Sequence, residues 1–140
     1  MSKDAHTRPL PEPAAISPLH PVLPQTPGRP LPWQHLFGSS RGLAMVQAAR
    51  AHPGPVLVIT HDSRSAQQLE DELRFYSAGD GLLPVLPFPD WESLPYDVFS
   101  PHQDILSQRL LTLSRLTGLK QGILLTSVTT LMHRLPPPDY

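Results

Sequence analysis

The 140-residue sequence contains no cysteine. This absence excludes disulfide bonds, zinc sites built on thiolates and a thiol nucleophile, and it fits a reducing compartment. Long apolar runs are also missing, because no stretch approaches the ~20 residues that a membrane span needs. The first residues lead into no apolar segment of the kind found in secretory signals. We therefore expect neither a membrane span nor a secretory leader.

A charge excess of one sign is missing as well. Eleven basic and twelve acidic residues give a net charge of -1, so no global field attracts the chain to nucleic acid or to an anionic membrane. The seven histidines show no metal-ligand spacing, and we expect His52, His61 and His133 at the surface or at an interface. The basic residues form no patch along the sequence; those from residue 31 onward are Arg41, Arg50, Arg64, Arg74, Arg109, Arg115, Lys120 and Arg134.

Proline, in contrast, is abundant. Nine of the 19 prolines fall within the first 32 residues. Each proline removes an amide donor and biases the residue before it towards extended geometry, so neither a helix nor a strand ladder can propagate. We expect residues 1–30 to form a disordered or polyproline-II tail, with a proline-rich docking ligand as the alternative. Residues 31–140 then form one folded domain.

Within that domain, strand patterns alternate with helix patterns. The run Val56–Thr60 is apolar and β-branched, which predicts a strand buried on both faces. Residues 82–86 and Gly122–Thr126 predict two further strands. Strands that alternate with helices indicate an α/β fold with a parallel sheet flanked by helices. Sheets of this kind usually bind ligands at the carboxyl ends of their strands.

Four helices are predicted between and around these strands. The first covers Leu43–Ala51, and the second begins at a cap formed by Asp62 or Ser63. The third covers His102–Leu116, and Ser127 caps a short fourth helix. The residues expected to face inward are Ala66, Leu69, Leu73 and Tyr76 in the second helix, Leu106, Leu110, Leu113 and Leu116 in the third, and Val128, Leu131, Met132 and Leu135 in the fourth.

The segment Pro87–Pro101 combines four prolines with aromatic residues. It is too rich in proline for regular structure, yet exposed rings would leave large apolar areas in water. We expect an ordered loop, pinned by Phe88, Trp91, Tyr96 and Phe99.

The segment Gly38–Ala44 resembles a loop that cradles phosphate before a helix. Such a loop needs converging amides, a lysine for the β and γ oxygens and a hydroxyl for magnesium. Aligned on Gly42, the lysine position holds Leu43 and the hydroxyl position holds Ala44, while the upstream glycine falls at Phe37. Arg41 could still meet an anion, but we expect Gly38 and its neighbours to form a turn that caps a helix, without ATP hydrolysis.

The acidic residues of the proline-rich loop form a second candidate site. Asp90, Glu92 and Asp97 could provide acid–base chemistry or hold a metal. Alternatively, they cap turns and face solvent while the rings pack. Ser100, His102 and Asp104 are the residue types of a hydrolase triad. Residues this close in sequence at a helix start rarely face one another, so we interpret Ser100 and Asp104 as helix caps.

The run from Asp90 to Leu110, DWESLPYDVFSPHQDILSQRL, closely resembles a segment of the bacterial transcription-repair coupling factor family, Mfd. Weaker similarity extends from Leu31 to Leu135 and includes GPVLVI from Gly54 and GILLTSVTTLMHRL from Gly122. The proline-rich tail resembles nothing. The motif residues carried over as family or interface candidates are Trp91, Glu92, Pro95, Tyr96, Asp97, Phe99, Pro101, His102, Asp104 and Arg109.

The resemblance implies the amino-terminal part of that family, a module similar to the excision-repair protein UvrB. Its first domain resembles a helicase lobe, of the RecA-like type, that has lost its nucleotide site. Full-length members use ATP and magnesium to move on double-stranded DNA, displace stalled RNA polymerase and recruit UvrA in the bacterial cytoplasm. The motor lies outside this chain, so the resemblance implies a non-catalytic scaffold, without cofactor or metal, that contacts the remaining domains of the coupling factor.

Two other interpretations stay open. The chain could be a freestanding interaction module that acts on repair proteins, or a small enzyme that uses Asp90, Glu92 or Asp97. If it is a truncated lobe, its sheet exposes an edge and apolar surface. We then expect marginal stability and self-association.

Overall fold

The computed structural model describes residues 14–79, 83–91, 103–133 and 135, and its centre is a parallel sheet. The strands are β3 (Pro55–Thr60), β4 (Val85–Phe88) and β5 (Gly122–Ser127), in the order β3-β5-β4. Leu57 and Leu86 both lie opposite Leu124 of the central strand. The predicted α/β fold with a parallel sheet is therefore confirmed.

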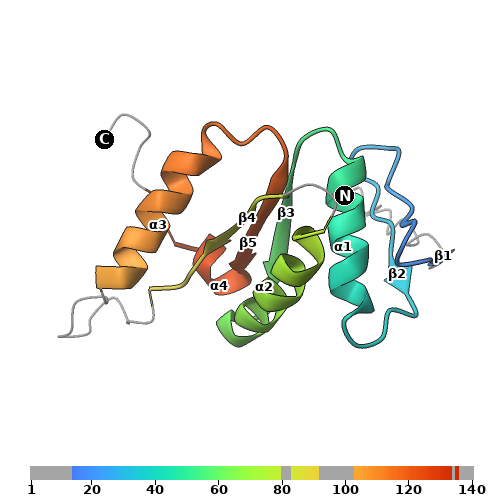
Figure 1. Cartoon of the computed structure of the whole chain (residues 1–140), viewed down its shortest axis with the longest axis horizontal. Coiled ribbons are helices and arrows are strands. Elements are labelled where there is room, and N and C mark those ends of the chain that lie inside the picture. The colour runs from blue at the N-terminus through green and yellow to red at the C-terminus, as the bar shows by residue number, and fades with distance from the viewer. Residues whose placement is uncertain (1–13, 80–82, 92–102, 134, 136–140) are drawn as a thin grey trace, which may run out of the picture.

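Two helices cover one face of this sheet. They are α1 (Ser40–Ala51) and α2 (Ser63–Ser77), which pack against each other, and α2 packs on all three strands (Figure 1). The predicted inward face of α2 is confirmed, since Leu69 and Leu73 are buried. The core between helices and sheet consists of Val46, Ala49, Val58, Leu69, Leu73, Leu83, Val85, Ile123 and Leu125.

The other two helices differ from the expected pattern. In α3 (Gln103–Leu116), which packs beside β4, the buried residues are Arg109 and Thr112, whereas Leu106 and Leu110 are exposed. The short α4 (Val128–Leu131) is capped by Ser127 as expected, but it turns Thr130 inward. The predicted inward positions that are exposed are Leu106, Leu110, Val128, Leu131, Met132 and Leu135. These predictions were wrong because both helices bury hydroxyl and guanidinium groups against strand ends.

The strand β3 is an edge strand, and this corrects the prediction that both of its faces are buried. Val58 is 8% exposed and faces the core, while Leu57 and Ile59 are 49% and 50% exposed on the opposite face. The apolar run correctly indicated a strand. It could not indicate that helices cover only one face of that strand.

The strand β4 includes a proline, which was expected to lie in irregular structure. β4 begins at Val85 and continues through Pro87 to Phe88, later than the predicted residues 82–86. Because β4 is the other edge of the sheet, Pro87 can lack an amide donor without breaking the ladder.

A small separate sheet precedes α1. It pairs β1 (Ala14–Ala15) in parallel with β2 (Trp33–Gln34), and the Trp33 indole Nε1–H donates to the Val22 carbonyl at 3.0 Å. The described part of the predicted tail is therefore structured where it meets β2, and Ile16 is 8% exposed. Residues 1–13 lie outside the described part. Within the described part, no helix has the length and apolarity to cross a membrane.

Candidate functional site

The segment Gly38–Ala44 forms the beginning of α1. The helix starts at Ser40, three residues earlier than predicted, so Arg41 to Ala44 lie in its first turns. Gly38 has a positive φ of 56°, which suits the turn before the helix. Ala44 is fully buried, and Arg41 is exposed. The segment is thus a helix start, and its lysine and hydroxyl positions are filled by Leu43 and Ala44.

A carboxylate from α2 lies against this helix start. A Cβ built on Gly42 would come within 2.9 Å of both Cβ and Oε2 of Glu72. Glu72 Oε2 is buried and has no hydrogen-bond partner among the described residues. The side chain therefore brings negative charge to the amino end of α1, where the helix dipole favours it and where it repels a phosphate.

Tyr76 adds a second contact from α2. Its hydroxyl lies 2.9 Å from the Ser39 Oγ atom at the N-cap position of α1. The Ser40 hydroxyl donates to the Phe37 carbonyl at 2.7 Å. Both serine hydroxyls in this turn are therefore hydrogen-bonded to other groups of the chain.

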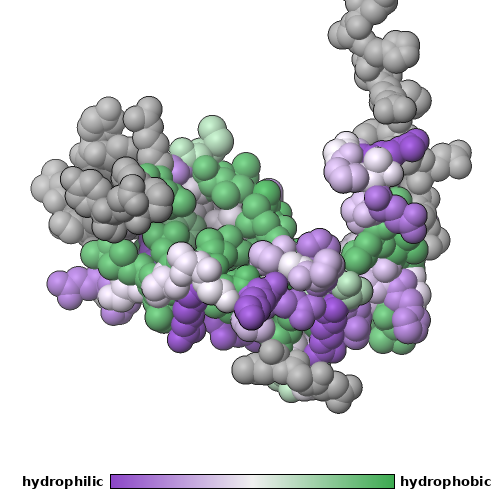
Figure 2. Space-filling view, turned by 90° about the horizontal axis from the view of Figure 1, so that it is seen from above, coloured by the Kyte–Doolittle hydropathy of each residue, from purple (hydrophilic) through white to green (hydrophobic). Residues whose placement is uncertain are grey.

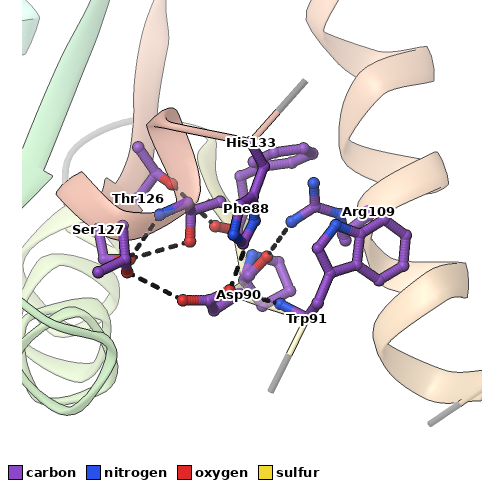
Figure 3. Close-up of polar contacts among 10 residues, drawn as sticks. Phe88, Asp90, Trp91, Arg109, Thr126, Ser127 and His133 are labelled. Carbon is purple, nitrogen blue, oxygen red and sulfur yellow. Dashed lines mark hydrogen bonds and ion pairs between the residues drawn. The ribbon is translucent and has the colours of Figure 1, made fainter. Parts of the chain in front are cut away.

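A stacked arginine lies between the end of β4 and α3. The guanidinium carbon of Arg109 is 4.0 Å from the ring centroid of Phe88 and 4.2 Å from that of Trp91 (Figure 3). Arg109 also donates to the Pro89 carbonyl, and only 3% of the residue is exposed. Burial lowers the pKa of the Arg109 guanidinium, while the nearby Asp90 carboxylate opposes this shift. The arginine fixes Phe88 and Trp91, so the predicted pinning is confirmed for these two rings.

The Asp90 carboxylate joins three segments next to this stack. Its Oδ1 accepts from the Trp91 amide at 2.7 Å, and its Oδ2 accepts from the Thr129 hydroxyl at 2.9 Å. His133 Nδ1 lies 3.6 Å from Asp90 Oδ1. The side chain of Asp90 is 20% exposed, so it differs from the expected solvent-facing cap.

Hydroxyl groups continue this network along β5 and α4. Ser127 Oγ lies 2.8 Å from Thr129 Oγ1 and 2.9 Å from Thr130 Oγ1. Thr126 donates to the Phe88 carbonyl at 3.0 Å. Figure 3 shows Asp90 between the labelled Ser127 and the stack of Arg109 on Trp91. The arrangement holds the carboxyl ends of β4 and β5 together.

A cavity of about 200 Å³ opens beside this network, at the carboxyl ends of the strands. Pro87, Phe88 and Leu125 form apolar walls. Its polar lining consists of Ser63, Gln67, Glu70, Asp90, Gln108 and Ser127. Among the described residues, the lining offers acidic and neutral polar groups and no basic side chain to pair with a phosphate.

The start of α2 holds a third polar cluster. Asp62 Oδ1 accepts from the Ser65 amide at 2.7 Å, which confirms Asp62 as the cap. This hydrogen bond is the main reason that the pKa of Asp62 is lowered from 3.8. His61 lies 2.8 Å from Asp62 and 3.3 Å from Ser65 Oγ, but its side chain is 80% exposed. An imidazole this open to water is a surface group, which agrees with the expectation of His61 at the surface or at an interface.

The remaining predicted site residues fall into two groups. Asp104 lies in the first turn of α3, as expected for a residue that favours a helix start. His52 holds the Gly54 amide through Nδ1 at 3.1 Å. Those outside the described part of the chain are Glu92, Pro95, Tyr96, Asp97, Phe99, Ser100, Pro101 and His102. Among the described residues, no group of three histidine, aspartate or glutamate side chains is placed to hold a metal.

Two parts of the site were missed in the sequence. Glu72 reads as one more polar residue of an amphipathic helix, and only the packing of α1 on α2 reveals its position. The hydroxyl run Thr126, Ser127, Thr129 and Thr130 begins at the end of the apolar strand β5 and continues into α4, so its placement at a strand end was available as a signal.

Comparison with known proteins found curated relatives, while no protein-family model matches the chain. The chain is 46% identical to the transcription-repair-coupling factor of Haemophilus influenzae over 98 residues, and this aligned region covers 70% of the chain. It is 41% identical over 111 residues to that of Escherichia coli and 35% identical over 109 residues to that of Mycobacterium bovis. The matched region spans only 8 to 9% of these relatives. The chain is therefore homologous to transcription-repair-coupling factors over about 70% of its length.

Proposed function

We propose that the chain is a non-catalytic scaffold lobe of a transcription-repair coupling factor. Its homology to that factor supports a place in transcription-coupled nucleotide excision repair. The resemblance noted above suggests the amino-terminal, UvrB-like region. On this proposal the chain contacts the remaining domains of the coupling factor. It acts in the bacterial cytoplasm. The whole protein, rather than this chain alone, binds UvrA, RNA polymerase and double-stranded DNA.

The observation that carries the non-catalytic role is the contact of Glu72 with Gly42 at the start of α1. A phosphate cradle needs amides open to an anion and a lysine for the terminal phosphates. Here Leu43 replaces the lysine, and the buried Oε2 atom of the Glu72 carboxylate lies beside the amino end of the helix. Because the substituted groups all disfavour a nucleotide, the site supports a structural role.

Calorimetric titration of the 140-residue chain with magnesium-ATP tests this part of the proposal. We expect no binding in the micromolar range, and a full-length coupling factor serves as the positive control. Micromolar binding by the chain would contradict the scaffold role, because it would show that the helix start still accepts a nucleotide.

A chimera tests the place in repair. The homologous segment of the Escherichia coli coupling factor is replaced by the matched segment of this chain, and strand-specific repair is measured in cells that lack the native factor. We expect repair to be retained. A matched chimera with Leu73→Asp, which places a charge at a fully buried core position, should lose it. A folded chimera without repair would argue against the proposal.

The freestanding module and the small enzyme remain alternatives that give different outcomes. Capture of UvrA or RNA polymerase by the isolated chain, with the full-length factor as control, would favour a freestanding module.

The enzyme alternative rests on Asp90, since Glu92 and Asp97 lie outside the described residues. Both oxygens of Asp90 accept hydrogen bonds from protein groups, which favours a structural role for it.

A further inference from the structure

The cavity at the carboxyl ends of β4 and β5 has no part in the proposed scaffold role. Its volume is about 200 Å³, and residues of α2 and α3 complete its lining. An apolar cavity of about 150 Å³ is large enough to hold benzene. The cavity is also more enclosed than the hollow along the proline-rich residues 24–30. In parallel sheets, ligands bind outside the carboxyl ends of the strands. Its size and its position therefore both suit a small ligand.

Glu70 of α2 gives this cavity a carboxylate that is only partly used. Its side chain is 22% exposed, and Arg74 contacts it through Nε at 2.8 Å and through Nη2 at 2.7 Å. Both contacts use the same oxygen, Oε1, so Oε2 has no hydrogen-bond partner among the described residues. A carboxylate that is mostly withdrawn from water gains from each further charged hydrogen bond that it accepts. Glu70 is therefore able to accept a hydrogen bond from a ligand.

The other polar groups of the lining are also acceptors. Asp90 adds a second carboxylate, whose side chain is 20% exposed. Gln67 and Gln108 are exposed residues of the lining, and their side-chain amides have no hydrogen-bond partner in the described part of the chain. The basic groups that interact with the two carboxylates, Arg74 and Arg109, are outside the lining. The lining thus presents negative charge and acceptor oxygens to a ligand.

Apolar surface alone does not distinguish this cavity, because hydrophobic residues also gather in a continuous area of the outer surface (Figure 2). Its distinguishing feature is that apolar walls, which include Phe88 and Leu125, stand beside carboxylates. A guanidinium is planar, stacks on aromatic rings and is more weakly hydrated than an ammonium, so it loses less on entering such a site. The chain already holds one guanidinium in this way, since Arg109 stacks on Phe88.

We propose that this cavity binds a planar organic monocation, an amidinium or guanidinium on a small apolar body, and that Glu70 Oε2 accepts a hydrogen bond from it. Asp90 adds negative charge beside the cation, and the apolar walls cover the body of the ligand. Such a group reaches the cavity either as a free small molecule or as the side chain of an arginine in another protein. Both sources share the chemistry that the cavity recognises.

Titration of the 140-residue chain with benzamidine, followed by heteronuclear NMR, tests the site. We expect saturable shifts in α2 and at the ends of β4 and β5. Benzamide has the same shape without the charge and should bind at least about tenfold more weakly, because it makes no charged hydrogen bond. N-acetyl-arginine methylamide distinguishes the two sources: binding as tight as that of benzamidine supports a protein side chain, and weaker binding supports a free molecule. Failure of both cations to bind at millimolar concentration, or equal binding of benzamide and benzamidine, would overturn the proposal.

Three variants test the part played by Glu70. Glu70→Gln should weaken benzamidine binding about tenfold. Asp71→Asn, which removes the same charge from an exposed residue of α2 outside the lining, should leave binding unchanged. Arg74→Met removes the ion pair but keeps the Glu70 carboxylate, so binding should become tighter.

The three variants also separate ligand binding from a structural effect. The pair of Glu70 with Arg74 is an exposed pair within one helix, so its loss costs little stability, and circular dichroism verifies that each variant is folded. If Arg74→Met weakened binding as much as Glu70→Gln, Glu70 would act only through its ion pair, and the proposal would be wrong. Unchanged affinity of the folded Glu70→Gln variant would equally count against it.

Discussion

At the scale of single residues, the stacked arginine accounts for the order at the start of the proline-rich segment. Arg109 contacts the ring of Phe88 at the end of β4, and the Pro89 carbonyl and Trp91 ring that follow it. One side chain of α3 therefore holds a segment in which proline prevents regular hydrogen bonds. A guanidinium is suited to this because its flat faces stack while its edge donates. The arginine is therefore a structural clamp between helix and loop.

Replacing Arg109 by alanine should lower the free energy of unfolding by about 2–3 kcal/mol, through loss of the stacking and of the charged hydrogen bond. Urea denaturation measures this change. The control is Arg115→Ala in the last turn of the same helix, where the side chain is exposed and the change should stay within about 0.5 kcal/mol. Equal effects of the two substitutions would show that the stack does not contribute.

The cap of α2 should make stability depend on pH. The pKa of Asp62 is lowered from 3.8 in the folded chain, chiefly by the Ser65 amide. Its stabilising effect is therefore complete above that value and is lost as the pH falls through the lower folded-state pKa. The urea midpoint of the native chain should exceed that of Asp62→Ala at pH 6, and the difference should shrink below pH 3.8. Asp71→Ala, an exposed site on α2, serves as the control, and a gap independent of pH would refute the assignment.

At the scale of elements, the entry into β5 depends on a glycine. Gly122 has a φ of 155°, and a Cβ there would lie 2.8 Å from the Pro84 carbonyl oxygen and 2.9 Å from Leu119 Cδ1. This close approach positions β5 beside β4, since the Ile123 amide donates to the same carbonyl at 2.8 Å. The central strand thus begins where only the smallest residue fits.

Substituting Gly122 by alanine should cost about 1–3 kcal/mol of unfolding free energy, because the backbone of Pro84 has to move. The matched control is Gly118→Ala, where a Cβ meets nothing within 4 Å and φ is not positive. Chemical denaturation of both variants gives the comparison. A loss as large in the control would indicate a general glycine effect.

The sequence allowed the elements themselves to be predicted well, because their patterns are local. The spacing of Leu69 and Leu73 located α2, and the apolar runs located β3 and β5. What failed depends on distant neighbours. An apolar run is the same in an edge strand as in a central one, so the exposure of Leu57 was invisible, and Pro87 entered a strand because it happened to lie at an edge.

The candidate site shows the same division. That the cradle's lysine and hydroxyl positions hold Leu43 and Ala44 can be read from the sequence, since residue types alone carry that chemistry. The contact of Glu72 with Gly42 could not be predicted, because it joins two residues of different helices that lie 30 positions apart in the sequence. The burial of Arg109 was also unpredictable, since its two aromatic neighbours, the Pro89 carbonyl and the Asp90 carboxylate, which together make a buried charge tolerable, come from another element.

At the scale of the whole molecule, helices cover one face of the sheet and leave part of the other open. Leu57 and Ile59 are about half exposed, so they contribute less hydrophobic stabilisation than they would in a strand covered on both faces. We expect an unfolding midpoint below ~65 °C, the upper end for ordinary mesophilic domains, and a midpoint that rises with protein concentration as association covers the edge. Scanning calorimetry at several concentrations tests both. A sharp, concentration-independent transition of a monomer well above ~65 °C would contradict the prediction.

The strand order also determines when this sheet can assemble. Within the part of the chain that the structure describes, the central strand β5 is the last of the three, and β3 and β4 pair with it alone. During synthesis, β3 and β4 therefore leave the ribosome before the strand with which they pair. Their pairing can begin only after Gly122–Ser127 has emerged. Such late, non-local pairing is slow to nucleate and leaves apolar strands open to other chains. We therefore expect this chain to be most prone to misfold during its synthesis, before the middle strand of the sheet has emerged.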